Sequence, residues 1–147
     1  MNGIMIWNSR GLGDLAKHKH IADCVCDHKP DFVVVVEMWK QNTLVGGLDY
    51  CWHWIAPKGR CGWILLGVNN ASIGVLAISV GDFHIKMHLQ NKMDNFKWNL
   101  VVVYGATQDS FKASFLKELV NCCRDNPYPM VLGGDFNILR YQQEKKR

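Results

Sequence analysis

Residues 32–37 of the chain read Phe32-Val33-Val34-Val35-Val36-Glu37. Five consecutive β-branched or aromatic residues predict a strand covered on both faces, as is usual for the parallel strand of a βαβ unit. Upstream, Leu15 to Lys29 carries apolar residues at helical spacing, and Pro30 ends this helix. Gly3 to Asn8 is a short apolar run that ends in polar residues. This part of the chain therefore predicts the order strand, helix, strand.

The rest of the chain predicts further strands, one more helix and a last strand. Short turn-like breaks separate the middle strands and favour antiparallel neighbours. In one of these strands apolar residues alternate with His84, Lys86 and His88, which indicates one buried face and one solvent-facing side. We expect strands at 50–56, 63–68, 73–80, 83–90, 98–104 and 130–132, and a helix at 109–124.

Length and composition favour a single folded domain. The chain has 147 residues, of which 48% are hydrophobic and 20% are charged, so it is neither a disordered protein nor a charged tail. The net charge of +4 permits a nucleic-acid partner, but the basic residues form no stripe, so such binding is expected to be weak. No stretch approaches the roughly 20 apolar residues that span a bilayer, so no membrane partner is expected.

The cysteines and the N-terminus favour an intracellular location, cytoplasmic or nuclear. The six cysteines contain no C-x-x-C pair and no zinc-finger spacing, so we expect reduced thiols. The first residues lack the basic region and long apolar segment of a secretory signal. A mitochondrial presequence is the alternative, because Arg10, Lys17 and Lys19 accompany only Asp14 among the first twenty residues.

Polar side chains stand at the ends of three apolar strands. Asn8 follows the first strand, Glu37 the second, and Asp135 with Asn137 the last. Ligands of open α/β sheets usually bind at the carboxyl ends of the strands, where carboxylate and amide oxygens can hold a hard cation such as Mg²⁺. Taken singly, each residue has a structural alternative as a turn former or a solvated strand end. Their joint occurrence favours a site.

The order of the motifs resembles a known family. They are Trp7-Asn8-Ser9-Arg10-Gly11-Leu12, then Lys29-Pro30-Asp31 before the strand with Glu37, then Val103-Tyr104-Gly105, and last Gly133-Gly134-Asp135-Phe136-Asn137. In this order they resemble the N-terminal part of the endonuclease/exonuclease/phosphatase superfamily. The residues of these motifs are most similar to those in the endonuclease domain of plant LINE-type (non-LTR) retrotransposons, and the match covers nearly the whole chain.

The resemblance implies a fold and a role for each motif residue. The implied fold is an α/β truncated β-sandwich of the deoxyribonuclease type, with mainly one mixed sheet and two flanking helices. Asn8 and Glu37 match positions that hold the catalytic Mg²⁺, with Glu37 as the direct ligand. Tyr104 matches a position near the scissile phosphate. Asp135 matches the carboxylate that prepares the attacking water, and Asn137 an amide that steadies the phosphate.

The chain also departs from the family pattern. That pattern ends in a Ser-Asp-His motif, whereas here the last histidine is His88 and no aspartate follows Asp135. We therefore expect a C-terminally truncated, partial domain at 1–139 with a polar, basic tail at 140–147. The histidine and the aspartate of the Ser-Asp-His motif are missing here, and catalytic groups of this kind each contribute a factor of about 10²–10⁴ to the rate. We therefore expect no useful nuclease activity from this chain alone.

The resemblance implies a two-sheet fold of which this chain retains about half, and this leaves two classes of function open. We expect the face of the retained sheet to lack its cover and to pair with a second copy or a protein partner. One class is therefore a non-catalytic interaction protein, such as a regulatory or toxic product of a retroelement fragment. The other is a nuclease-like remnant that still binds Mg²⁺ or nucleic acid weakly, with residual phosphodiesterase activity as its strongest form.

Overall fold

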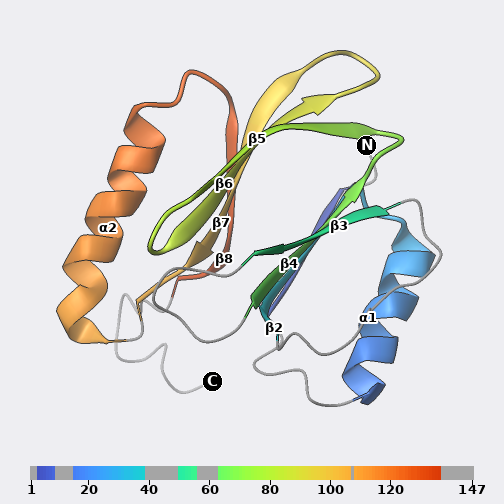
Figure 1. Ribbon diagram of the computed structural model, residues 1–147, viewed down its shortest axis with the longest axis horizontal. Coiled ribbons are helices and arrows are strands. Elements are labelled where there is room, and N and C mark those ends of the chain that lie inside the picture. Colours follow the sequence, from blue (N-terminus) through green and yellow to red (C-terminus); the bar gives the residue numbers. More distant parts are fainter. Residues whose placement is uncertain (1–2, 9–14, 39–49, 56–62, 107, 137–147) are drawn as a thin grey trace.

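The computed structural model describes residues 3–8, 15–38, 50–55, 63–106 and 108–136 (Figure 1). Its elements follow the predicted order closely, and both helices begin where the sequence indicates. The elements are β1 (Ile4–Asn8), α1 (Leu15–His28), β2 (Phe32–Met38), β3 (Tyr50–Ile55), β4 (Trp63–Asn69), β5 (Ile73–Val80), β6 (His84–Asn91), β7 (Lys97–Tyr104), α2 (Asp109–Arg124) and β8 (Met130–Asp135).

The strands form two mixed sheets of four strands each. The first sheet has the order β1-β2-β4-β3 and the second the order β5-β6-β7-β8. In the first sheet β1 and β2 are parallel and joined by α1, which confirms the predicted βαβ unit. In the second sheet only β7 and β8 are parallel. The α/β sandwich with two helices is confirmed, whereas the expectation of mainly one sheet is wrong.

The turn between β4 and β5 explains this difference. The short break after Asn69 was expected to join antiparallel neighbours, but it carries the chain from one sheet to the other. The buried carboxylate of Asp31 holds this crossing, because it accepts hydrogen bonds from Ser72 Oγ at 2.8 Å and from the backbone N–H of Gly3 at 3.0 Å. Local alternation of residue types cannot distinguish such a crossing from a hairpin, since both need only a tight turn.

The two sheets pack face to face around the main core. Phe32, Val34 and Leu66 of the first sheet meet Met87 and Leu100 of the second, and all five side chains are fully buried. Burial of large apolar side chains from both sides is the dominant stabilising contribution in such a sandwich. The inner face that was expected to lack a cover is therefore covered, by a sheet that this same chain supplies.

One helix covers the outer face of each sheet, so the layers run α2, second sheet, first sheet, α1 (Figure 1). Ile21 and Val25 of α1 pack on the first sheet, and Phe115 of α2 packs on the second. Phe111 and Val120 of α2 stay about half exposed. Neither described helix is both long and apolar enough to cross a membrane.

Candidate functional site

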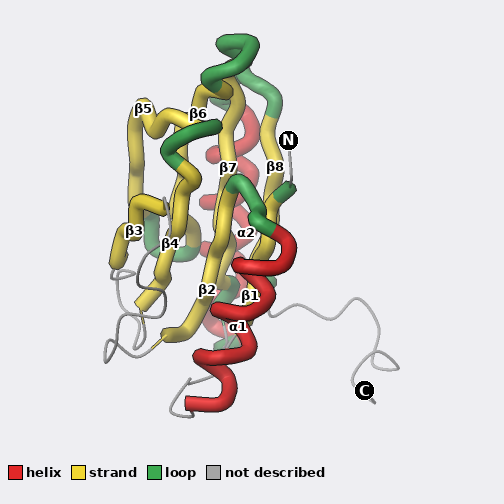
Figure 2. The backbone as a smooth tube through the Cα atoms, turned by 90° about the vertical axis from the view of Figure 1, so that its right-hand side faces the viewer, coloured by secondary structure: helices red, strands yellow, loops and turns green. Residues whose placement is uncertain are grey.

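Four strands end at the same edge of the sandwich. β1 and β2 both begin beside Asp31, and β6 ends there, because Lys92 N–H donates to the carbonyl of Ser72 at 2.9 Å. β7 is antiparallel to β6 and parallel to β8, so these two strands also begin at that end. The strands run roughly vertically in Figure 2, so their ends lie at two opposite edges of the sandwich. The carboxyl ends of β1, β2, β7 and β8 therefore share the opposite edge, here called the carboxyl edge.

Asn8 and Glu37 lie on neighbouring strands at the carboxyl edge. Asn8 is the last residue of β1 and pairs with Val36, so Glu37 is the next residue along β2. The pairing of β2 with β4 shifts register between Val35 and Met38, the interval that contains Glu37. Such irregularities often lie next to functional sites, because they change the direction of a side chain. The backbone thus brings the two predicted metal ligands together, while their roles stay predictions.

Asp135 reaches the same edge from the second sheet. It pairs with Tyr104 in the parallel register of β7 and β8. Two residues earlier, Gly133 lies directly against β1, since a Cβ atom there would stand 2.2 Å from Ile6 Cδ1. Asp135 lies two residues after Gly133 on β8, and Asn8 lies two residues after Ile6 on β1. The glycine of the motif therefore allows the close approach that puts the two strand ends side by side.

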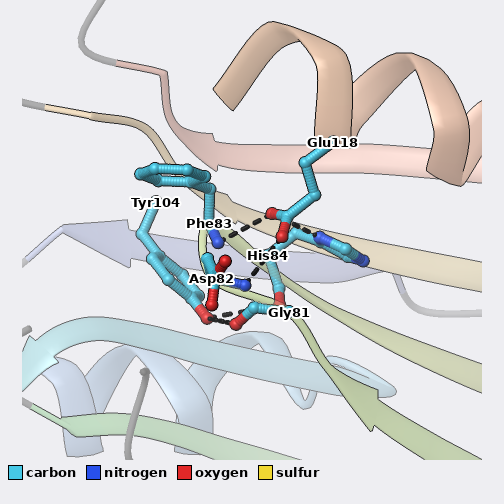
Figure 3. A network of polar contacts seen from close by, with 6 residues as sticks. All are labelled: Gly81, Asp82, Phe83, His84, Tyr104 and Glu118. Carbon is cyan, nitrogen blue, oxygen red and sulfur yellow. Dashed lines mark hydrogen bonds and ion pairs between the residues drawn. The ribbon is translucent and has the colours of Figure 1, made fainter. Parts of the chain in front are cut away.

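Tyr104 has a structural contact at this edge. Its ring is buried, and its hydroxyl lies 3.0 Å from the carbonyl oxygen of Gly81 and 3.2 Å from that of His84, to which it donates (Figure 3). A hydroxyl has a single proton, so the Tyr104 proton is shared between these carbonyls. The contact fixes the turn between β5 and β6 against β7. The predicted role of Tyr104 near a phosphate stays a prediction.

Sequence reasoning missed the carboxylate of Glu118 beside this turn. Its oxygens accept hydrogen bonds from the backbone N–H groups of Asp82 and Phe83, both at 2.7 Å, and from His84 Nδ1 at 2.9 Å (Figure 3). The carboxylate of Glu118 is fully engaged by these three hydrogen bonds. Its pair with His84 therefore has a structural role, which is to attach α2 to the turn. The partners are 34 to 36 residues apart in sequence, so no local pattern could have revealed them.

The donor types at the carboxyl edge fit a hard cation. Asn8, Glu37 and Asp135 offer amide and carboxylate oxygens, which suit Mg²⁺ better than zinc or copper. Among the side chains that the structure describes, no three His, Cys, Asp or Glu groups gather as a metal site. Asn137, the remaining predicted site residue, lies outside the described residues, as does the predicted tail at 140–147.

The arrangement of the two sheets is shared with solved structures of low sequence identity. No protein-family model matches the chain, and no curated protein does. The catalytic domain of human Nocturnin has a TM-score of 0.70 and 15% identity over 92% of this chain and 64% of its own length. A Bacteroides thetaiotaomicron mannosyl-6-phosphatase has a TM-score of 0.68 and 14% identity over 95% of this chain and 67% of its own length.

A third structure carries the family name itself. An endonuclease/exonuclease/phosphatase family protein from Bacteroides thetaiotaomicron has a TM-score of 0.66 and 14% identity, over 92% of this chain and 62% of its own length. The chain thus spans about two thirds of the length of the proteins it resembles. At these identities the likeness concerns the fold alone. The chain therefore has the fold of the endonuclease/exonuclease/phosphatase-family proteins to which it is similar.

Proposed function

We propose that this chain is an endonuclease-like protein of the retroelement type, which binds Mg²⁺ at the carboxyl edge and does not cleave phosphodiesters by itself. The observation that carries the proposal is the convergence of Asn8, Glu37 and Asp135 at the ends of β1, β2 and β8. Strand ends are rigid supports, which keep ligands in place for a cation. A bound Mg²⁺ would supply charge neutralisation for a phosphate group at this edge.

Each residue has a distinct part in the proposal. The carboxylate of Glu37 and the amide of Asn8 hold the cation, and Asp135 provides the acceptor that orients a water molecule toward a phosphate. No histidine follows His88 in this chain. Both histidines of β6 already have partners, because His84 donates to Glu118 and His88 contacts Asn99. Of these two histidines His84 lies nearer the carboxyl edge, and Glu118 already holds its ring, which supports binding without turnover.

Metal binding and plasmid nicking test this proposal together. We expect Mg²⁺ to shift the backbone amide NMR signals around Asn8, Glu37 and Asp135. Glu37→Ala should weaken binding about tenfold or more, whereas Asp23→Ala, which removes an exposed carboxylate of α1, should leave it unchanged. We expect no nicking of supercoiled DNA above the Mg²⁺ background.

Two results would contradict the proposal. Absence of any Mg²⁺-dependent shift at the carboxyl edge would remove the metal site. Nicking that both Glu37→Ala and Asp135→Ala abolish would instead assign a residual Mg²⁺-dependent phosphodiesterase activity to the chain.

A second candidate, a non-catalytic interaction protein, is favoured by the outer strand β8. Among the described strands β8 is the last of its sheet, and its Val131 and Leu132 side chains are 43% and 38% exposed. Leu116 and Val120 of α2 are also about half exposed. Exposed apolar side chains along an outer strand are typical of strand pairing with another chain. The proposed partner is a second copy or another protein.

Light scattering after size exclusion tests self-association. We expect a dimer whose fraction rises with concentration, and we expect Val131→Lys to shift it to monomer. Leu76→Lys is the matched control, because Leu76 is 48% exposed on β5 at the opposite edge of the same sheet. A wild-type chain that stays monomeric at every concentration would contradict self-association.

A further inference from the structure

A groove lies on the outer face of the second sheet, away from the carboxyl edge. Its volume is about 280 Å³, and β5, β6, β7 and the segment after α2 line it. The β6 residues in it alternate with Ile85, Met87 and Leu89, whose side chains are buried between the sheets. The groove thus opens on the opposite face from the main core. We call this groove the outer groove. Its polar lining residues are Ser79, Lys86, His88, Asn99, Asn126 and Tyr128.

A chain of hydrogen bonds fixes the orientation of the groups in the outer groove. The backbone N–H of Tyr128 donates to Asn126 Oδ1 at 3.1 Å, and Asn99 Nδ2 donates to the same oxygen at 2.5 Å. Asn99 Oδ1 is therefore the acceptor for His88 Nδ1 at 2.8 Å, so this ring nitrogen carries a proton. In the neutral ring His88 Nε2 is then an acceptor.

Two donors in the outer groove have no acceptor among the described residues. Asn126 Nδ2 is buried and has no hydrogen-bond partner in this part of the chain. Lys86, a half-buried residue, makes no ion pair with any carboxylate in the described part of the chain. Buried donors without partners are rare in folded proteins, because the hydrogen bonds that they lose with water are not replaced. A cation and an amide donor in one groove provide the contacts that an oxyanion requires.

We propose that the outer groove binds a phosphate group, free or carried by a small monoester. Lys86 supplies the positive charge, Asn126 Nδ2 donates to a phosphate oxygen, and His88 Nε2 accepts from a protonated one. The ring of Tyr128 lies 4.5 Å from the His88 ring, centroid to centroid, and is partly exposed, so it offers a surface to the organic part of an ester. Asn99, almost fully buried, holds His88 in place.

NMR titration with inorganic phosphate, adenosine monophosphate and adenosine tests this proposal. We expect phosphate and the monophosphate to shift signals of β6 and of residues 126–128 at millimolar concentrations, and adenosine to leave them unchanged. A monophosphate that binds more tightly than phosphate would identify the ester as the ligand source, and equal affinities would identify free phosphate. A single-stranded oligonucleotide serves as the contrasting probe, and binding of this probe alone would overturn the proposal.

Variants separate the groove from general charge effects. Lys86→Met should weaken phosphate binding about tenfold or more, because one charge-assisted contact is lost. Asn126→Asp keeps the acceptor for Asn99 and Tyr128 but removes the donor, so it should abolish binding. Lys117→Met, on the exposed side of α2, removes the same charge and should leave the affinity unchanged.

Unchanged affinity in Lys86→Met would overturn the proposal, as would no phosphate-dependent shift in the groove. If Asn126→Asp does not fold, as judged by circular dichroism, the phosphate affinity of Lys86→Met alone tests the proposal. Because the groove lies away from the carboxyl edge, loss of Mg²⁺ binding in Glu37→Ala should leave phosphate binding intact.

Discussion

Glu118 shows how one side chain joins distant parts of this fold. It projects from α2, and its carboxylate accepts the N–H groups of the turn that connects β5 to β6. These backbone groups have no strand partner on that side, so an acceptor from elsewhere is needed. Tyr104 holds the same turn from the β7 side through the carbonyls of Gly81 and His84. The turn is thus fixed by two side chains that come from outside its own hairpin.

The substitution Glu118→Ala should lower the free energy of unfolding by about 2–3 kcal/mol, because it leaves the N–H groups of Asp82 and Phe83 without their acceptor. Urea denaturation followed by circular dichroism measures this change. Lys117→Ala, at the neighbouring exposed position of α2, should change it by less than about 0.5 kcal/mol. An equal effect of the two substitutions would show that the contact with the turn contributes nothing to stability.

Tyr50 predicts a pH dependence at the other end of the sandwich. Burial, and then the negative charge of Asp31, raise the pKa of its phenol above the usual value of about 10. The phenol also donates to the carbonyl of Pro30. Since the folded-state pKa is raised, this contribution to stability is complete below the unfolded-state pKa and is lost as pH rises through the folded-state pKa.

The wild type should therefore lose stability more steeply above about pH 10 than Tyr50→Phe, which has no proton to lose at this position. Urea unfolding at a series of alkaline pH values gives both slopes. Parallel slopes for the two proteins would contradict the assignment.

At the scale of elements, the close pairing of β7 with β8 depends on glycine. Gly134 has a φ of 134°, and a Cβ atom there would lie 2.1 Å from the carbonyl oxygen of Val103. Its neighbour Gly133 allows β8 to lie against Ile6 of β1. The two glycines before Asp135 therefore have separate tasks, one within the sheet and one between the sheets. Both place the end of β8 at the carboxyl edge.

Gly134→Ala should destabilise the fold by about 3 kcal/mol or more, because the positive φ and the contact with the Val103 backbone both oppose a side chain. Gly74→Ala is the matched control on β5, where a Cβ atom would come no closer than 3.8 Å to its neighbours. We expect that control to change stability by less than about 1 kcal/mol. Thermal unfolding of both variants measures the difference, and similar midpoints would contradict this account of the strand pairing.

At the scale of the whole molecule, the sandwich is closed within the described residues. The main core takes buried side chains from both sheets, and each outer face carries one helix. The turn held by Asp31 connects the two sheets at one end. The sheets should therefore fold and unfold as a single cooperative unit, since neither can keep its inner face buried without the other.

Leu66→Ala in the first sheet and Leu100→Ala in the second should each cost about 2–5 kcal/mol. Both should lower the same single transition, whether it is followed by circular dichroism or by tryptophan fluorescence. Leu76→Ala, which truncates an exposed side chain of β5, should have little effect. Two separate transitions in either core variant would contradict cooperative unfolding of the sheets.

The order and type of the elements follow from the amino-acid sequence alone, as do the residues at the strand ends. The run of valines in β2 and the helix before it follow from propensity and periodicity, which are local properties. For the same reason Asn8, Glu37 and Asp135 could be assigned to the ends of strands before the sheets were known.

The division of the strands between two sheets depends on tertiary packing, as does the set of side chains that meet across the sheets. The crossing at Asp31, the contact of Glu118 with a distant turn and the groove beside Asn126 all join residues at least 27 positions apart. Such contacts form only when two surfaces pack against each other. Local sequence preferences contain no information about that packing, because the same preferences suit a single open sheet or a closed sandwich.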